Sequence, residues 1–182
     1  MAAKYPNILR SLNPDHLRRF PNGYFLDVGL NFQRANDTML KMISLLGLLV
    51  MIASLVGLYA IGSLFSFQPI TIALQVIAVA LMVWARVTFG RRSFHASAEP
   101  TPGGLVTTGP YRYIRNPIYT AGCLFGWGGI VTHWSWQSAT LGVLLFLGAL
   151  TRILCEERLL KQSYPEYLQY SKDTKRMIPY VF

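Results

Sequence analysis

Two long stretches of the chain carry no charged side chain. Residues 42–85 and 116–151 contain no Lys, Arg, Asp or Glu and are dominated by apolar residues and glycine. Each stretch is about twice the ~20 residues that one helix needs to cross the hydrocarbon core of a bilayer. The pattern therefore predicts two helical hairpins in a membrane, each formed by two spans.

Short polar breaks divide each apolar stretch. Pro69 follows the first break, and proline stops a helix because it lacks a backbone donor. Residues 133–137 interrupt the second stretch, and the tryptophans there are typical of a membrane interface. The predicted spans are residues 42–65, 70–88, 117–134 and 138–154.

The distribution of charge predicts the orientation of these spans. The chain has 17 Lys and Arg against 8 Asp and Glu, a net charge of +9, and both breaks lack Lys and Arg. Because Lys and Arg concentrate on the cytoplasmic side, we expect the segments 1–41, 86–115 and 152–182 inside and both breaks outside. This gives a multi-pass integral membrane protein of the all-α class with both termini in the cytoplasm.

The composition agrees with a membrane protein. Of the 182 residues, 52% are hydrophobic and 14% are charged, whereas soluble domains carry roughly 25% charged residues. These values exclude a disordered chain and disfavour a water-soluble globule. Because the basic residues flank apolar stretches, we expect them to meet an anionic membrane surface and no nucleic acid. Cys123 and Cys155 have no zinc-type spacing, so we expect two core cysteines and no metal site.

Two segments on the cytoplasmic side differ from the spans. Residues 1–41 mix apolar and basic positions, which predicts one or two interfacial helices. Residues 89–116 form a loop, because three prolines and three glycines between positions 96 and 110 exclude a continuous helix. Leu105 and Val106 in this loop are apolar, so we expect it to fold back onto the protein.

The membrane domain, residues 42–182, ends in a polar helical segment, residues 155–182. Apolar residues keep helical spacing through Leu160, so the last span is expected to continue into the cytoplasm. Pro165 then ends this helix and opens a short one that contains Tyr167.

Charged side chains at the end of the last span are candidates for chemistry. Arg152 and Glu156 lie four residues apart and share one helix face, and Glu157 and Lys161 form a second such pair. Ionisable groups near the hydrocarbon boundary are costly and are often functional. Two ion pairs that only stabilise the helix are the alternative interpretation.

An aromatic and basic motif precedes the third span. Pro117 is expected in the first turn of that span, with Asn116 as its N-cap. A helix N-terminus there favours a carboxylate or phosphate, and an interfacial aromatic belt is the alternative. Within the span, Gly122 and Gly126 are spaced for close helix packing. The motif reads Gly109-Pro110-Tyr111-Arg112-Tyr113-Ile114-Arg115-Asn116-Pro117-Ile118-Tyr119.

These motifs together resemble a known superfamily, the isoprenylcysteine carboxyl methyltransferases and phospholipid methyltransferases. The resemblance covers about residues 86–180. It implies an integral membrane enzyme that uses S-adenosylmethionine. The similar segments are the run 104–111, the run 115–119, Glu156-Glu157, Tyr164-Pro165-Glu166-Tyr167 and Arg176-Met177-Ile178-Pro179.

The resemblance also implies roles for individual residues. Glu156 would contact the cofactor from the last span, and Arg152 would hold an acidic acceptor. An amine or thiol acceptor would need a base, for which Glu157 and Tyr119 are candidates. Asn116 matches phospholipid methyltransferases, whereas carboxyl methyltransferases usually carry His there, which disfavours a prenylcysteine acceptor. The other implied cofactor residues are Gly103, Gly104, Leu105, Val106, Tyr111, Asn116, Pro117, Ile118 and Tyr119.

We therefore expect methyl transfer from S-adenosylmethionine to a lipid-like or small apolar acceptor at the cytoplasmic face. The acceptor atom would belong to a carboxylate, an amine or a thiol. Two alternatives stay open at this point. One is an NADPH-dependent membrane reductase of the sterol-reductase type, which shares a similar C-terminal half. The other is a membrane partner protein without catalytic activity.

Overall fold

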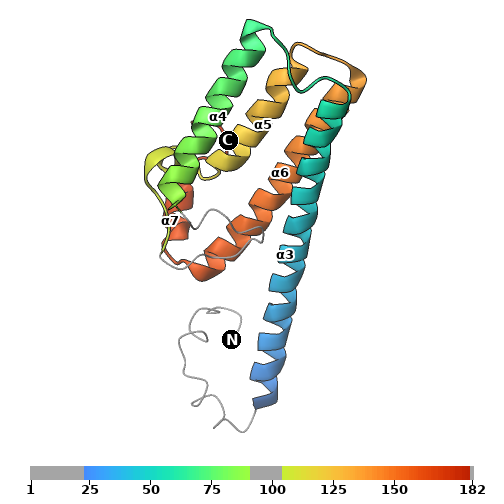
Figure 1. Cartoon of the computed structure of the whole chain (residues 1–182). Coiled ribbons are helices and arrows are strands. Elements are labelled where there is room, and N and C mark those ends of the chain that lie inside the picture. Colours follow the sequence, from blue (N-terminus) through green and yellow to red (C-terminus); the bar gives the residue numbers. More distant parts are fainter. Residues whose placement is uncertain (1–22, 91–103, 181–182) are drawn as a thin grey trace. The chain divides into compact units, whose positions relative to one another are not determined.

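The computed structural model describes residues 23–90 and 104–180 (Figure 1). These residues form five α-helices and one short 3₁₀ helix, and they contain no strand beyond one isolated bridge. The all-α prediction is confirmed. The chain divides into two compact units, Met1–Leu40 and Lys41–Phe182. The long helix α3 (Gly23–Ala60) begins in the first unit and ends in the second, which holds the candidate site described below.

The second unit is a helical bundle with a polar end. Helix α4 packs along α5, and α5 packs along α6 (Figure 1). The 3₁₀ helix η3 contacts α4, and α7 contacts α6, so both short helices lie where α4 and α6 end. The helices after α3 are α4 (Pro69–Phe89), η3 (Gly109–Arg112), α5 (Pro117–Ile130), α6 (Trp136–Ser163) and α7 (Tyr167–Asp173).

Helix α3 ends at a glycine, before the break that contains Pro69. Gly62 has a φ of +69°, its amide donates to the carbonyl of Tyr59, and the amide of Ser63 donates to the carbonyl of Leu58. These bonds form a Schellman motif, in which a residue with left-handed backbone terminates a helix. The predicted first span, residues 42–65, therefore extends past the real helix end.

The start of α3 also differs from the prediction. The helix is continuous from Gly23 through the predicted boundary at residue 41. Residues 23–41 are therefore part of the first long helix, and the interfacial position of segment 1–41 stays a prediction. Residues 1–22 lie outside the described part of the chain.

The remaining long helices follow their capping signals. Helix α4 has proline in its first turn and Gly90 after its last residue, close to the predicted 70–88. Helix α6 begins with a capping box. The amide of Ser138 donates to Oγ of Ser135 at 3.0 Å, and the amide of Ser135 donates to Oγ of Ser138 at 2.9 Å. Helix α6 continues past the predicted end at residue 154 to Ser163, and α7 follows Pro165 as expected.

Three helices of the described residues are long and apolar enough to cross a membrane. They are Asn31–Ala60, Pro69–Phe89 and Trp136–Ser163, and each carries several large apolar side chains that are exposed. Exposure of such an apolar surface is favourable in hydrocarbon and unfavourable in water. Helix α5 has 14 residues and measures only about 21 Å, against the ~30 Å of a hydrocarbon core. The fourth span, residues 117–134, therefore stays a prediction.

Helices α3 and α6 cross at two glycines. A Cβ atom added to Gly148 would lie 2.8 Å from the carbonyl oxygen of Gly47, and one added to Gly47 would lie 2.9 Å from that of Gly148. Small residues allow backbones in membranes to approach this closely. The predicted packing role also fits Gly126, where a Cβ would lie 2.5 Å from Cδ2 of Leu145. Gly122 is much less crowded.

Substitution of Gly148 by alanine should destabilise the bundle. The new methyl group would meet backbone, which cannot move aside as a side chain can, and overpacking of this kind costs about 1–3 kcal/mol. Thermal unfolding of the detergent-solubilised protein measures the effect. Gly122→Ala is the matched control, because its Cβ would meet only Cε of Met51 at an ordinary 3.8 Å. Equal unfolding temperatures for the two variants would contradict the backbone contact.

Candidate active site

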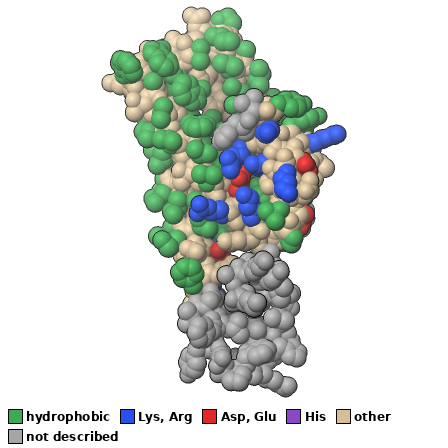
Figure 2. Space-filling model, turned by 180° about the vertical axis from the view of Figure 1, so that it is seen from behind, with side chains coloured by type: hydrophobic (Ala, Val, Ile, Leu, Met, Phe, Trp, Pro, Cys, Tyr) green, Lys and Arg blue, Asp and Glu red, His purple; other side chains and the backbone are tan. Residues whose placement is uncertain are grey.

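Charged side chains gather at the polar end of the second unit. Figure 2 shows the second unit from behind, with Lys and Arg side chains clustered around Asp and Glu at this end. Hydrophobic side chains cover other parts of the same view. Glu156 is half-buried and Glu157 is buried, whereas five basic residues of this end are exposed. The exposed basic residues of η3, α6, α7 and the following segment are Arg112, Arg158, Lys161, Lys172 and Lys175.

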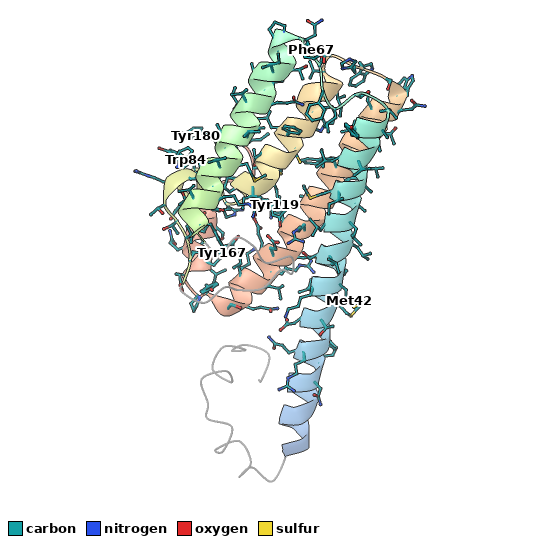
Figure 3. The ribbon with its side chains drawn as sticks, viewed as in Figure 1. Met42, Phe67, Trp84, Tyr119, Tyr167 and Tyr180 are labelled. Carbon is teal, nitrogen blue, oxygen red and sulfur yellow. The ribbon has the colours of Figure 1, made fainter. Side chains whose placement is uncertain are left out.

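Tyr119 links α5 to α6 through two charged side chains. Its hydroxyl donates to Oε1 of Glu156 at 2.6 Å and accepts a hydrogen bond from Nε of Arg152. The same Nε lies 3.1 Å from Oε1 of Glu156, and Cζ of Arg152 lies 5.8 Å from the centre of the Tyr119 ring. Figure 3 shows Tyr119 in the space between α5 and α6. The structure therefore joins three of the predicted site residues in one cluster.

This cluster has capacity for a ligand. The side chain of Arg152 is 6% exposed, and its Nη1 is buried without a hydrogen-bond partner in the described part of the chain. Buried polar groups are almost always paired, and an unpaired one is costly. The side chain of Glu156 is 23% exposed, and its contacts with Tyr119 and Arg152 both use Oε1. A guanidinium nitrogen and a partly open carboxylate are thus available side by side.

Tyr111 lies near this cluster in η3. Its ring packs against Phe89 at the end of α4, with 5.6 Å between ring centres. Burial above all, then Tyr170 and more weakly the charge of Glu156, raise the pKa of the Tyr111 hydroxyl above its ordinary value, partly opposed by Arg86. Burial likewise raises the pKa of Tyr170 to about 12. Both hydroxyls therefore stay protonated at neutral pH and can donate hydrogen bonds.

A glycine brings the loop back onto α4. Gly109 has a φ of +57°, which suits glycine. A Cβ added there would lie 2.5 Å from Oγ1 of Thr88 and 3.2 Å from Nε1 of Trp84. Glycine is therefore needed for both the backbone shape and the close approach of η3 to α4.

The loop residues implied by the resemblance are only partly described. Gly103 lies outside the described residues. Gly104 has a φ of +83°, again in the range that favours glycine. Leu105 and Val106 are half buried, in agreement with a loop that folds back onto the protein.

Helix α5 begins as predicted, but Asn116 does not cap it with its side chain. Pro117 stands in the first turn and is fully buried, and Ile118 is half buried. Asn116 occupies the N-cap position, yet its Nδ2 donates to the carbonyl oxygen of Arg176 at 3.3 Å. The expected cap is therefore replaced by a contact with the C-terminal segment.

Glu157 is buried between two arginines. Its Oε1 accepts from Nε of Arg115 at 3.1 Å, and its Oε2 accepts from Nε of Arg176 at 3.2 Å. These partners differ from the expected Lys161, which is exposed. Sequence reasoning missed both arginines because they are 42 and 19 residues away, beyond any helical spacing. Their presence in the two motifs 115–119 and 176–179 was the available signal.

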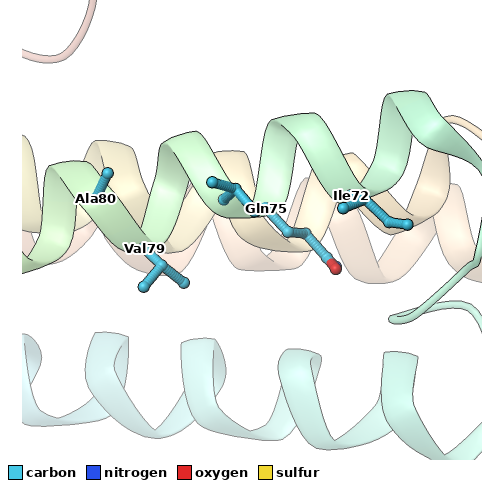
Figure 4. A pocket seen from close by; sticks show the side chains of 5 residues that line it. Ile72, Gln75, Val79 and Ala80 are labelled. Carbon is cyan, nitrogen blue, oxygen red and sulfur yellow. The ribbon is translucent and has the colours of Figure 1, made fainter.

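An apolar groove on α4 is separate from this site. It has a volume of about 410 Å³ and is lined by Ile72, Gln75, Val76, Val79 and Ala80 (Figure 4). These residues belong to the first part of α4, whereas the site lies beyond its last turn. In the described residues, no group of three His, Cys, Asp or Glu side chains could hold a metal ion. Cys123 and Cys155 are free and buried.

The fold and site together define a class of protein. Long apolar helices carry, at their polar end, a cluster of guanidinium, carboxylate and tyrosine hydroxyl groups. Such a cluster has the donors and acceptors to hold a polar molecule where the apolar helices end.

Comparison with known proteins gives the family. A family model described as phospholipid methyltransferase matches residues 65–167, more than half of the chain. The match contains the whole Arg152–Tyr119–Glu156 cluster. The chain therefore belongs to the phospholipid methyltransferase family and is a membrane protein. The family match also confirms the superfamily resemblance predicted from the motifs. No match was found among curated proteins or among solved structures.

Proposed function

We propose that the protein transfers a methyl group from S-adenosylmethionine to a lipid-like or small apolar acceptor at the cytoplasmic face of a membrane. The family supports methyl transfer in a membrane setting. The observation that carries the proposal is the cluster of Arg152, Tyr119 and Glu156, with one buried guanidinium nitrogen left unpaired. Such a cluster is suited to a cationic cofactor beside a polar acceptor group.

The residues of the site fit S-adenosylmethionine. Bound there, the cofactor would supply an electrophilic methyl group on a sulfonium. Glu156 offers a negative charge, and the faces of Tyr111 and Tyr119 offer favourable surfaces for a cation. We assign the remaining cofactor contacts to the loop before η3 and to the start of α5, namely Gly103, Gly104, Leu105, Val106, Asn116, Pro117 and Ile118.

Arg152 would hold the acceptor. Its free Nη1 suits an anionic group such as a carboxylate or a lipid phosphate. A carboxylate acceptor needs no base, so the protein would act by alignment and exclusion of water. An amine or thiol must lose a proton. Tyr119 could take that proton while passing its own to Oε1 of Glu156, along the observed 2.6 Å hydrogen bond.

The exposed basic residues at the site support an orientation in the membrane. By the positive-inside rule, this end of the protein and both termini would lie in the cytoplasm. Helices α3, α4 and α6 would cross the bilayer. The shorter α5 would complete a fourth crossing with the turn that follows it, where the bilayer thins or the turn residues enter the interface. A water-soluble cofactor and a lipid acceptor then meet at one edge of the membrane.

Ligand binding tests the proposal directly. The detergent-purified protein is titrated calorimetrically with S-adenosylmethionine, its demethylated product S-adenosylhomocysteine, and NADPH. We expect micromolar binding of the first two and no response to NADPH. Binding of NADPH alone would replace the proposal with a membrane reductase. If a folded sample binds none of the three ligands, the result would favour a partner protein without catalytic activity.

A further inference from the structure

We infer that residues 174–178, the C-terminal strap, position the cofactor-binding start of α5, and that Glu157 holds the strap in place. This inference rests on the proposed function, because it assigns a role toward the same site. It makes Glu157 a positioning residue and not the base considered from the sequence.

The strap pairs with the chain just before α5. The amide of Arg115 donates to the carbonyl of Lys175 at 2.7 Å, and the amide of Asn116 donates to that of Arg176 at 3.0 Å. Ile114 and Lys175 form an isolated parallel bridge. These bonds hold the strap and the residues 114–116 together as two adjacent extended segments.

The strap also follows the first turn of α5. Oγ1 of Thr120 donates to the carbonyl of Met177 at 3.0 Å, next to the contact between Asn116 and Arg176. The side chain of Met177 is buried in a core cluster against which Tyr119 packs. The strap therefore touches the turn that carries Tyr119 through both backbone and side chain.

Glu157 joins the strap, the start of α5 and α6. One of its oxygens is bonded to Arg115, which precedes α5, and the other to Arg176 of the strap. The guanidinium of Arg115 also donates to the carbonyls of Ser171 at 2.7 Å and Thr174, and so fixes the end of α7. Because both oxygens of Glu157 already accept from guanidinium groups, its role is to align these elements.

This alignment bears on the reactive cluster. On α6, Glu157 directly follows Glu156. Its partner Arg115 lies four residues before Tyr119, which belongs to α5. A start of α5 held firmly against α6 keeps the hydroxyl of Tyr119 within 2.6 Å of Glu156. Misplacement of a site by about 1 Å can cost roughly 100-fold in activity. Loss of the contact between Arg176 and Glu157 should therefore lower the affinity of the site for the cofactor.

Arg176→Ala tests the inference, with Lys175→Ala as a matched control. Both variants remove one positive charge from the strap, but only Arg176 contacts Glu157 through its side chain. The first readout is the affinity for S-adenosylhomocysteine. The second is hydrogen exchange at the amides of Arg115 and Asn116 in the protein without ligand.

We expect Arg176→Ala to weaken S-adenosylhomocysteine binding at least about tenfold and to speed exchange at both amides. Lys175→Ala should change neither. Arg176→Lys, which keeps the charge beside Glu157, should recover most of the affinity, and Glu157→Gln should resemble Arg176→Ala.

Two results would overturn the inference. Exchange and affinity that stay at the wild-type level in folded Arg176→Ala would show that the side-chain contact does not hold the strap. Faster exchange with unchanged affinity would show that the strap does not position the site. A wild-type protein that binds no S-adenosylhomocysteine is a different outcome, because it would contradict the proposed function itself.

Discussion

Replacement of Glu156 by alanine should weaken S-adenosylmethionine binding by about 10–150-fold, because hydrogen bonds to a charged group contribute about 1.5–3 kcal/mol. The residue carries the partly open carboxylate of the cluster and lies at the end of the apolar part of α6. The protein should still fold, because Glu156 is not part of the buried core clusters of the described chain. Calorimetric titration of the variant measures the loss.

Two further variants make this result specific. Glu166→Ala removes an exposed carboxylate at the start of α7 and should bind the cofactor as the wild type does. Glu156→Gln keeps an acceptor for the Tyr119 hydroxyl but loses the charge, so it should rank between alanine and the wild type. Unchanged affinity in a folded Glu156→Ala variant would remove Glu156 from the cofactor site.

Replacement of Arg152 by alanine should act on the acceptor more than on the cofactor. The variant loses the buried Nη1 that has no partner within the described protein. A lost charge-assisted bond of about 1.5–3 kcal/mol should lower kcat/KM for an anionic acceptor by roughly 10–150-fold. Affinity for S-adenosylmethionine should change far less, because Glu156 and Tyr119 keep their direct hydrogen bond.

The role of Arg152 is decided by comparing the loss of kcat/KM for the acceptor with the loss of affinity for S-adenosylmethionine. Arg158→Ala is the control, since it removes an exposed arginine from the same helix. Arg152→Lys should recover only part of the acceptor effect, because lysine cannot reproduce the planar fork of a guanidinium. Equal losses for cofactor and acceptor would indicate that Arg152 only supports the structure around Tyr119.

Much of the helical fold was predictable from local signals. Pro69 and Gly90 bound α4 within a residue of the predicted span, because proline and glycine act on the backbone next to them. The end of α3 was missed because Gly62 terminates the helix before the more conspicuous Pro69. The extension of α6 through the charged residues followed from helical spacing, which needs no tertiary information.

The site was predictable only where residues share a helix or a motif. Arg152 and Glu156 are four residues apart, and their ion pair follows from helix geometry. Tyr119 entered through the resemblance, and its position between them needed the packing of α5 against α6. The contacts of the two arginines with Glu157 could not be predicted from spacing, because tertiary folding brings these distant residues together, and only their presence in the two motifs gave a signal.

The strap has a consequence for the order in which the protein matures. Chains are synthesised from the N-terminus, and earlier parts fold first. Helices α3 to α6 are therefore synthesised before residues 174–178. Until the strap is present, the amides of Arg115 and Asn116 lack their carbonyl partners. Completion of the site thus comes after synthesis of all its helices, and a message that stops before codon 174 should yield a helical protein that cannot hold its cofactor.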